Sequence, residues 1–122
     1  MSPVEIAKQS FLAFTSGDRA ANEAVIADDF SFTSPLDNQL DRATYFERCW
    51  PNNESISGFE FIRVIGHDNE VIVTYEGTAT SGRRFRNTEV LTIENGKIRK
   101  VEVYFGWNVP HDAPQGGHIA DA

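Results

Sequence analysis

Residues 85-FRNTEVLTIENGKIRKVEVYFGW-107 decide the fold of this chain, because two strand-like runs meet there at a tight turn. Both runs are rich in β-branched and aromatic residues, and Asn95-Gly96 between them tolerates the positive φ angles of a two-residue hairpin. Residues 59–66 and 71–80 repeat this composition around a polar turn at 67–70. The second half of the chain therefore predicts a meander of antiparallel strands.

The first half has a helical period instead. Ser2-Pro3-Val4-Glu5 has the composition of a capped helix start, and apolar residues then recur at spacings of three and four as far as Phe14. Gly17 is expected to end this helix. Asp18 can cap a second helix, which we expect to end at Asp28-Asp29.

A strand is expected to begin at Phe30 and to break at Pro35. Asp41 can cap a third helix that Pro51 ends, and residues 52–58 are expected to form a loop. Helices followed by strands predict an α+β domain, with three N-terminal helices packed into a strongly curved, mostly antiparallel sheet. We expect the whole to form a cone-shaped α+β barrel with a small-molecule pocket at its open end.

The charge of the chain excludes several classes of partner. Its 122 residues carry a net charge of −7, whereas nucleic acids and anionic membranes attract basic surfaces. Arg83, Arg84 and Arg86 stand beside a Ser-Gly turn and are interpreted as a solvated strand edge. No N-terminal leader and no apolar run of about 18 residues is present. We therefore expect a cytoplasmic protein with no nucleic acid or membrane partner.

Metal and cofactor chemistry lack a sequence signal. Cys49 is the only cysteine, so no intramolecular disulfide and no cysteine metal cluster is expected, and packing is its predicted role. His67 lies in a predicted turn, and His111 and His118 lie in the tail without the spacing of metal ligands. No phosphate-binding glycine loop is present. We expect neither a metal nor a cofactor.

Glu89 is the most informative candidate residue. On an alternating strand it shares a face with Asn87, Leu91 and Ile93, whereas Thr88, Val90 and Thr92 share the other. If the first face is buried, a carboxylate lies inside the domain, where it is costly unless paired, hydrogen-bonded or protonated. Glu89 would then face a ligand as an acid or a hydrogen-bond donor. If the second face is buried, Glu89 is solvated or in an ordinary salt bridge.

Further candidate residues are expected around the same pocket. Asp37 follows Pro35-Leu36 and is either a turn-forming residue or a base that faces Glu89. Asn87 is a candidate polar anchor. The strand from 97 to 107 carries an apolar face of Val101, Val103 and Phe105 that Trp107 extends. The aromatic residues expected to wall the pocket, or simply to fill the core, are Phe32, Tyr45, Trp50, Phe105 and Trp107.

Four stretches resemble the nuclear transport factor 2-like superfamily, and its SnoaL-like, ketosteroid isomerase-like branch in particular: 11-FLAFTSGD-18, 27-ADDFSF-32, 94-ENGKI-98 and 101-VEVYF-105. The resemblance implies a single domain over residues 1–107, helices packed into a curved sheet, a pocket at the open end and a homodimer through the sheet. Residues 108–122, with two prolines and two glycines, are expected to form a flexible or arm-like tail.

Within this resemblance, Ser34 stands at the position of the ketosteroid isomerase base and Ser10 at the position of its tyrosine. Both roles are lost, so a true ketosteroid isomerase is not expected. Glu89 falls at the position of the late-strand acid that stabilises an oxyanion. Val103 falls where the related epoxide hydrolases place an acid, which argues against that activity.

The same scaffold serves isomerases, cyclases, dehydratases and non-catalytic binding modules, so the resemblance specifies the fold more closely than the reaction. The favoured hypothesis is an enzyme that transfers protons on a hydrophobic, carbonyl-bearing molecule, with Glu89 and Asp37 as catalytic residues and Ser34 among the ligand contacts. The alternative is a ligand-binding, dimerisation or protein-interaction module without chemistry. The sequence leaves this choice open.

Overall fold

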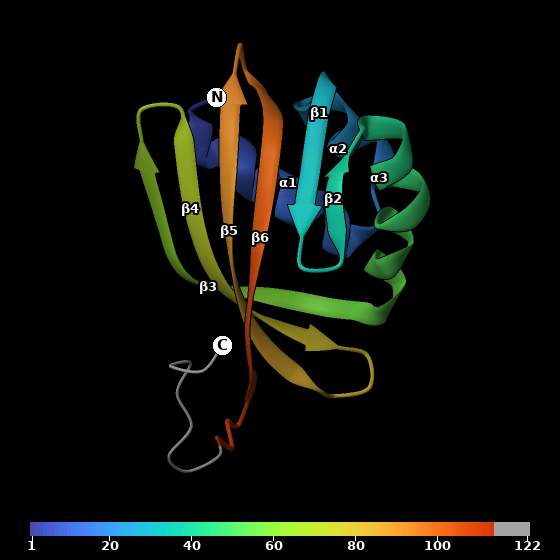
Figure 1. The fold of residues 1–122 in the computed structure, drawn as a ribbon, viewed down its shortest axis with the longest axis vertical. Coiled ribbons are helices and arrows are strands. Elements are labelled where there is room, and N and C mark those ends of the chain that lie inside the picture. Colours follow the sequence, from blue (N-terminus) through green and yellow to red (C-terminus); the bar gives the residue numbers. More distant parts are fainter. Residues whose placement is uncertain (114–122) are drawn as a thin grey trace.

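The computed structural model describes residues 1–113 and places three helices on one side of a curved six-stranded sheet (Figure 1). This arrangement confirms the α+β prediction. The helices are α1 (Pro3–Ser16), α2 (Arg19–Val25) and α3 (Arg42–Arg48), followed by a short 3₁₀ helix at Trp50–Ser55. The strands are β1 (Ile26–Ser34), β2 (Asp37–Leu40), β3 (Ile56–His67), β4 (Glu70–Ala79), β5 (Arg84–Glu94) and β6 (Lys97–Val109).

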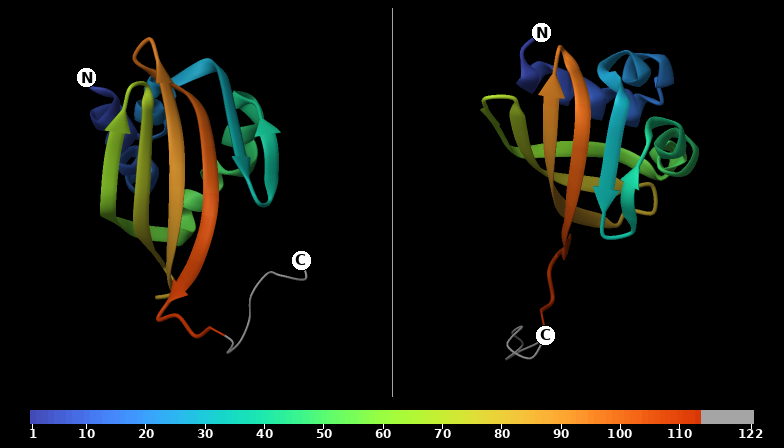
Figure 2. Two further views of the ribbon diagram at one scale, coloured as in Figure 1. Left: turned by 60° about the vertical axis from the view of Figure 1, so that its left-hand side comes forward. Right: turned by 45° about the horizontal axis from the view of Figure 1, so that its top comes forward.

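The strands lie in the order β2-β1-β6-β5-β4-β3, so the sheet is unclosed and β2 and β3 form its edges. All neighbouring pairs are antiparallel except β1 and β6, which run parallel. Register shifts interrupt four of the five pairings, and bulges of this kind increase the twist and bend of a strand. Figure 2 shows the resulting curvature from two further directions.

The three helix starts and the end of α1 form as their sequence signals predict. Ser2 and Glu5 make a reciprocal capping box at the start of α1, and Gly17 ends that helix with a left-handed φ of 69°. The Asp18 carboxylate accepts from the backbone N–H of Ala21 at 3.1 Å, and Asp41 caps α3 in the same way. These caps satisfy N–H groups that a helix start leaves without partners.

Four boundaries in the first half differ from the sequence prediction. The helix α3 ends at Arg48, and Pro51 lies within the following 3₁₀ helix instead of ending α3. β1 begins at Ile26, so Asp28 and Asp29 lie within the strand instead of ending α2. The short strand β2 was missed, because residues 37–40 become a strand only by pairing with β1, as Leu40 does with Phe32. The expected loop at 52–58 contains most of the 3₁₀ helix and the start of β3. For the strands, the missing information is a pairing partner elsewhere in the chain.

The core lies between the helices and the concave face of the sheet. Phe11 of α1 packs edge-on against Phe59, Phe61 and Tyr75, with ring centroids 5.1–5.5 Å apart. Val71 and Val73 of β4 are fully buried in the same core. Leu91 of β5 and Ile98 of β6 are at most 2% exposed. Burying aromatic side chains of this size accounts for a large part of the stability of a small domain.

A bulge in β6 changes the direction of its last side chains. Asn87 of β5 pairs with Phe105, but Phe85 pairs with Asn108, so β6 carries one extra residue over this interval. The alternation therefore breaks, and the Trp107 side chain is 53% exposed. The expectation that Trp107 extends the inward apolar face is wrong for this reason.

The end of β6 also bears on the expected domain limit. The strand runs through Val109, two residues beyond the predicted boundary at 107. The greater part of the predicted tail, residues 114–122, lies outside the residues that the structure describes. Over the described residues, no helix is long and apolar enough to cross a membrane.

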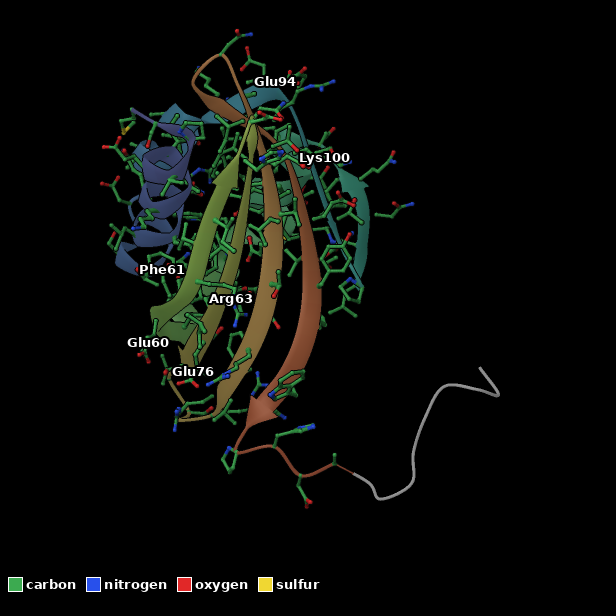
Figure 3. The ribbon with its side chains drawn as sticks, turned by 90° about the vertical axis from the view of Figure 1, so that its left-hand side faces the viewer. Glu60, Phe61, Arg63, Glu76, Glu94 and Lys100 are labelled. Carbon is green, nitrogen blue, oxygen red and sulfur yellow. The ribbon has the colours of Figure 1, made fainter. Side chains whose placement is uncertain are left out.

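The convex face of the sheet carries an ion-pair cluster in which the half-exposed Arg84 and Arg86 surround the buried Glu76. Glu76 of β4 is 6% exposed, and Arg84 donates to its Oε2 atom from Nε at 3.0 Å and from Nη2 at 2.8 Å. Arg86, directly across on β5, lies 3.6 Å from the other carboxylate oxygen. These contacts correct the interpretation of Arg84 and Arg86 as a simple solvated edge. Figure 3 places Glu76 toward the end of the sheet opposite Glu94.

Candidate functional site

A cavity of about 240 Å³ lies between the helices and the concave face of the sheet. Seven phenylalanines line it, together with aliphatic side chains and a few polar groups. Most of the predicted site residues meet there, namely Phe32, Ser34, Asp37, Tyr45, Asn87, Glu89 and Phe105. An apolar cavity with a small number of convergent polar groups is the usual form of a small-molecule site.

The two tryptophans do not line this cavity. Trp50 is 8% exposed and packs against Phe14 and Phe46, so it belongs to the core behind the cavity wall. Trp107 lies on the surface beyond the β6 bulge, with its ring 5.3 Å from that of His111. Trp50 therefore fills the core, which was the alternative to a pocket wall, and Trp107 does neither.

Glu89 faces the cavity because β5 turns the face of Leu91 and Ile93 inward. These two side chains are 2% and 5% exposed, and strict alternation carries Glu89 and Asn87 to the same side. On the neighbouring strands, Val73 and Val103 stand directly opposite Glu89. The carboxyl group at the cavity wall is thus flanked by an apolar residue on either side.

The environment of Glu89 raises its affinity for a proton. Burial among apolar groups raises the pKa of Glu89 from its ordinary 4.5 to about 7, and a hydrogen bond from Tyr75 opposes part of that rise. The Tyr75 hydroxyl donates to Glu89 Oε2 at 2.7 Å. Within residues 1–113, no Lys or Arg forms an ion pair with Glu89. The carboxyl group is therefore held by a neutral donor and exchanges its proton near neutral pH.

Tyr75 is a site residue that the sequence analysis missed. It lies on β4 directly across from Asn87, whose side-chain Nδ2 donates to the Tyr75 hydroxyl at 3.3 Å. Burial and the nearby Glu89 carboxylate raise the pKa of Tyr75 far above its usual range, so its hydroxyl remains protonated. The alternation of Val71, Val73 and Tyr75 carried the signal, since all three share the inward face.

Asp37 lies in the same cavity, and its carboxylate already has several partners. Oδ1 forms an ion pair with Arg48 at 3.1 Å, and Oδ2 accepts from the Ser34 hydroxyl at 3.1 Å. The Cys49 thiol lies 3.9 Å from Oδ2. These contacts join the start of β2 to the end of α3. Burial and the neighbouring Asp37 charge raise the pKa of Cys49 to about 11, which keeps the thiol protonated and unreactive.

A second polar group lies where the resemblance places the lost tyrosine. The Ser10 hydroxyl donates to Asn22 Oδ1 at 2.8 Å, and the Asn22 Nδ2 atom is buried without a hydrogen-bond partner. Burial and Glu89 raise the pKa of Tyr45 well above its usual range, and the neighbouring Asn22 amide opposes the rise. Tyr45 therefore presents a protonated phenol at the cavity wall.

The described residues offer no cluster suited to a metal ion. No group of three or more His, Cys, Asp or Glu side chains within residues 1–113 has the geometry to hold one. The chemistry that these side chains can perform is proton transfer and hydrogen bonding, through one carboxyl group of near-neutral pKa, two phenols and a second carboxylate.

Comparison with protein families identifies the chain. The model of the SnoaL-like domain family matches residues 7–101, which is most of the sequence. The chain therefore belongs to the SnoaL-like family, within the nuclear transport factor 2-like superfamily. No curated protein matches the sequence significantly.

Several solved structures share the fold at low sequence identity. A candidate ketosteroid isomerase of Kribbella flavida is 15% identical with a TM-score of 0.75, covering 97% of this chain and 86% of its own. A candidate polyketide cyclase of Sinorhizobium meliloti is 19% identical with a TM-score of 0.69, covering 81% and 93%. A de novo designed protein with a curved β-sheet is 14% identical with a TM-score of 0.74, covering 87% and 88%. Because a designed chain matches as well, these likenesses describe the fold alone.

Proposed function

We propose that this protein is an enzyme that transfers protons on a small, mostly apolar molecule bearing a carbonyl group, with Glu89 as its acid/base. One observation supports this proposal above the others. The carboxyl group of Glu89 faces an apolar cavity, has no cationic partner among residues 1–113, and has a pKa of about 7. Catalytic acids and bases work best when their pKa lies near the working pH.

The near-neutral pKa gives Glu89 two uses in one reaction. As a carboxylate it removes a proton from the carbon next to the carbonyl group, and as an acid it returns that proton to another atom. Enolisation of this kind is the step that isomerisation and aldol-type cyclisation share. The protonated phenol of Tyr45 supplies a hydrogen-bond donor to the oxygen on which charge develops, while Tyr75 donates its one proton to Glu89.

The cavity wall supports an apolar ligand. Phe32 and Tyr45 pack with ring centroids 5.1 Å apart, and the half-exposed Phe105 stands at the rim. The volume of about 240 Å³ lies below the range of about 300–1,000 Å³ typical of drug-sized sites. We therefore propose a ligand of one or two rings, held by aromatic contacts and by Asn87, Ser34 or both.

Asp37 is the second proposed catalytic group, as a base. One of its oxygens forms an ion pair with Arg48, and the Ser34 hydroxyl and the Cys49 thiol contact the other. A carboxylate with this many partners is a weaker base than one left free, because each partner must be released. We therefore assign the leading role to Glu89.

The test is solvent deuterium exchange on a panel of cyclic ketones and phenolic ketones, followed by NMR. The wild-type protein should exchange the protons next to the carbonyl group of a bound ketone. Glu89→Gln should lower the exchange rate at least 100-fold, within the range of general acid–base catalysis. Asp37→Asn should lower it less. Glu94→Gln, which removes an exposed carboxylate from the same strand, is the matched control and should exchange normally.

A ligand-binding module without chemistry is the second candidate. Ser10 and Ser34 replace the two residues of the isomerase pattern, and both Asp37 oxygens are engaged. This candidate predicts ketones that bind and displace solvent from the cavity with no deuterium exchange in any variant. Normal exchange in Glu89→Gln would instead show that another group acts as the base.

We also propose that the convex face of the sheet forms a homodimer. Ile65, Ile72 and Tyr104 lie on this face and are 51%, 37% and 56% exposed. Ile65 and Ile72 are direct cross-strand neighbours, so they form a continuous apolar patch. Light scattering should give the mass of two chains, and Ile72→Lys should return the mass of one.

A further inference from the structure

A chain of hydrogen bonds leads from the backbone of β6 to the carboxyl group of Glu89. The Gly106 N–H donates to Asn87 Oδ1 at 3.3 Å, and Asn87 Nδ2 donates to the Tyr75 hydroxyl oxygen at 3.3 Å. The Tyr75 hydroxyl then donates to Glu89 Oε2 at 2.7 Å. Four residues on three neighbouring strands are thus joined in a single line.

The direction of this chain is fixed by chemistry. A backbone N–H can only donate, so the Asn87 side chain must turn its oxygen toward Gly106. The amide nitrogen then faces Tyr75 and can only donate to its oxygen. With that oxygen accepting, the Tyr75 proton is directed to Glu89. The first two links therefore have one orientation each, and the Tyr75 hydroxyl completes the line as the donor to Glu89.

The bulge in β6 provides the starting point. Register is lost between the pairs Asn87–Phe105 and Phe85–Asn108, and Gly106 lies in that interval. A bulge leaves a backbone group without its ladder partner, and here the Asn87 side chain takes that place. Gly106 also approaches β5 so closely that a Cβ atom would lie 2.3 Å from the Arg86 carbonyl oxygen. A larger residue could not hold its N–H at this position.

We propose that Asn87 is a positioning residue, which holds the Tyr75 hydroxyl as a constant donor to Glu89 Oε2 and leaves Glu89 Oε1 to carry the exchangeable proton toward the ligand. Only the last clause rests on the proposed function, since the orientation of Tyr75 does not depend on a ligand. Asn87 is thereby given a structural task beyond the ligand contact expected of it.

This arrangement has a consequence for the acidity of Glu89. Burial alone favours the neutral acid, and the fixed Tyr75 donor stabilises the carboxylate, which keeps the pKa of Glu89 near neutral. The titratable groups that act on Glu89 are Tyr75 on β4 and Tyr45 on α3, both protonated. Loss of the Tyr75 donor should therefore raise the pKa of Glu89.

The test measures the Glu89 pKa by carboxyl ¹³C NMR titration, without any ligand. Tyr75→Phe should raise the pKa by about one unit, the value of one hydrogen bond. In Asn87→Asp, one carboxylate oxygen still accepts from the Gly106 N–H. The other oxygen replaces the amide donor that faces Tyr75, so the phenol should donate to this oxygen and turn away from Glu89. The change in the Glu89 pKa that Asn87→Asp causes should be larger in the wild-type background than in the Tyr75→Phe background. Equal shifts in both backgrounds would mean that Asn87 acts by charge alone, and would overturn the proposal.

A second measurement needs no variant. In the wild-type protein, the Asn87 amide protons should show nuclear Overhauser contacts to the Tyr75 ring protons. Stronger contacts to the Gly106 amide proton would mean that the side chain is turned round, and would also overturn the proposal. Neither result depends on turnover. The positioning role can therefore fail while the proposed function stands, and the proposed function can fail while the positioning role stands.

Discussion

Two glutamates on neighbouring strands show what decides the use of a buried carboxylate. Glu76 of β4 faces the convex side of the sheet and Glu89 of β5 faces the cavity. Hydrogen bonds from Arg84, together with Arg86, hold the pKa of Glu76 below its usual range. Burial raises the pKa of Glu89 to about 7, although the hydrogen bond from its single neutral donor, Tyr75, lowers it.

The difference between the two sides lies in the partners. A carboxylate paired with two guanidinium groups is stabilised as an ion and helps to hold neighbouring strands together. A carboxyl group held by a phenol keeps a proton that it can exchange. The comparison teaches that a buried acid indicates a reaction only when its charge is left uncompensated. The sequence carries this distinction in part, because Arg86 is the direct cross-strand neighbour of Glu76 and Val73 that of Glu89.

The largest expected effect is on stability at and above neutral pH. The folded protein holds the Glu89 proton up to about pH 7, while the unfolded chain releases it near 4.5. Stability should therefore fall as the pH rises from about 4.5 to 7, by about 3 kcal/mol in total. Glu89→Gln removes this loss and should unfold at higher urea concentration than the wild type at pH 8, but not at pH 4.

Urea unfolding at several pH values checks this prediction. Glu94→Gln should keep the pH dependence of the wild type, because Glu94 lies at the exposed end of the same strand (Figure 3). If Glu89→Gln loses stability between pH 4.5 and 7 as the wild type does, another group is responsible for the loss and the two glutamates do not differ as described.

An effect of opposite sign and smaller size is expected at Glu76. Its folded-state pKa lies below the ordinary 4.5, so its ion pairs stabilise the protein above that pH, and this stability is lost as the pH falls through the folded-state value. Glu76→Gln should be less stable than the wild type at pH 7, with the difference closing in acid. Because Arg84 and Arg86 are 49% and 41% exposed, the loss should be modest.

The smallest expected effect is a different response to salt of the stability contributed by Glu76 and by Glu89. At about 1 M NaCl the screening length falls to about 3 Å, which weakens partly exposed ion pairs. The stability difference between the wild type and Glu76→Gln should shrink in salt, whereas that between the wild type and Glu89→Gln should not. Equal responses in thermal unfolding would show that Glu89 also has a cationic partner in solution.

Much of the fold could be predicted because its signals are local. Capping residues, the Gly17 stop and the Asn95-Gly96 hairpin each act through neighbouring backbone groups. The start of β1, the strand β2 and the β6 bulge could not be predicted in this way. Each depends on a partner strand, and neither periodicity nor composition records which strand that is.

The candidate site, like the fold, could be predicted only where its signal lies within a single strand. Alternation along β5 brought Glu89 and Asn87 to the side of Leu91 but left open which face turns inward. The structure turns that face toward the cavity. Tyr75 was missed because apolar and β-branched residues occupy both faces of β4, so its composition does not indicate which face turns inward. Trp107 was misplaced because one extra residue in β6 reverses the direction of every side chain after it.

The parallel pairing of β1 with β6 has a consequence for how the protein folds. Residues 26–33 of β1 pair with residues 98–102 of β6, so the ends of a long intervening segment must meet before the sheet is continuous. Contacts between distant parts of a chain slow folding, because closing a large loop costs entropy before any contact compensates for it. During synthesis, the hairpin of β1 and β2 must therefore wait for the last strand before its inner edge is covered.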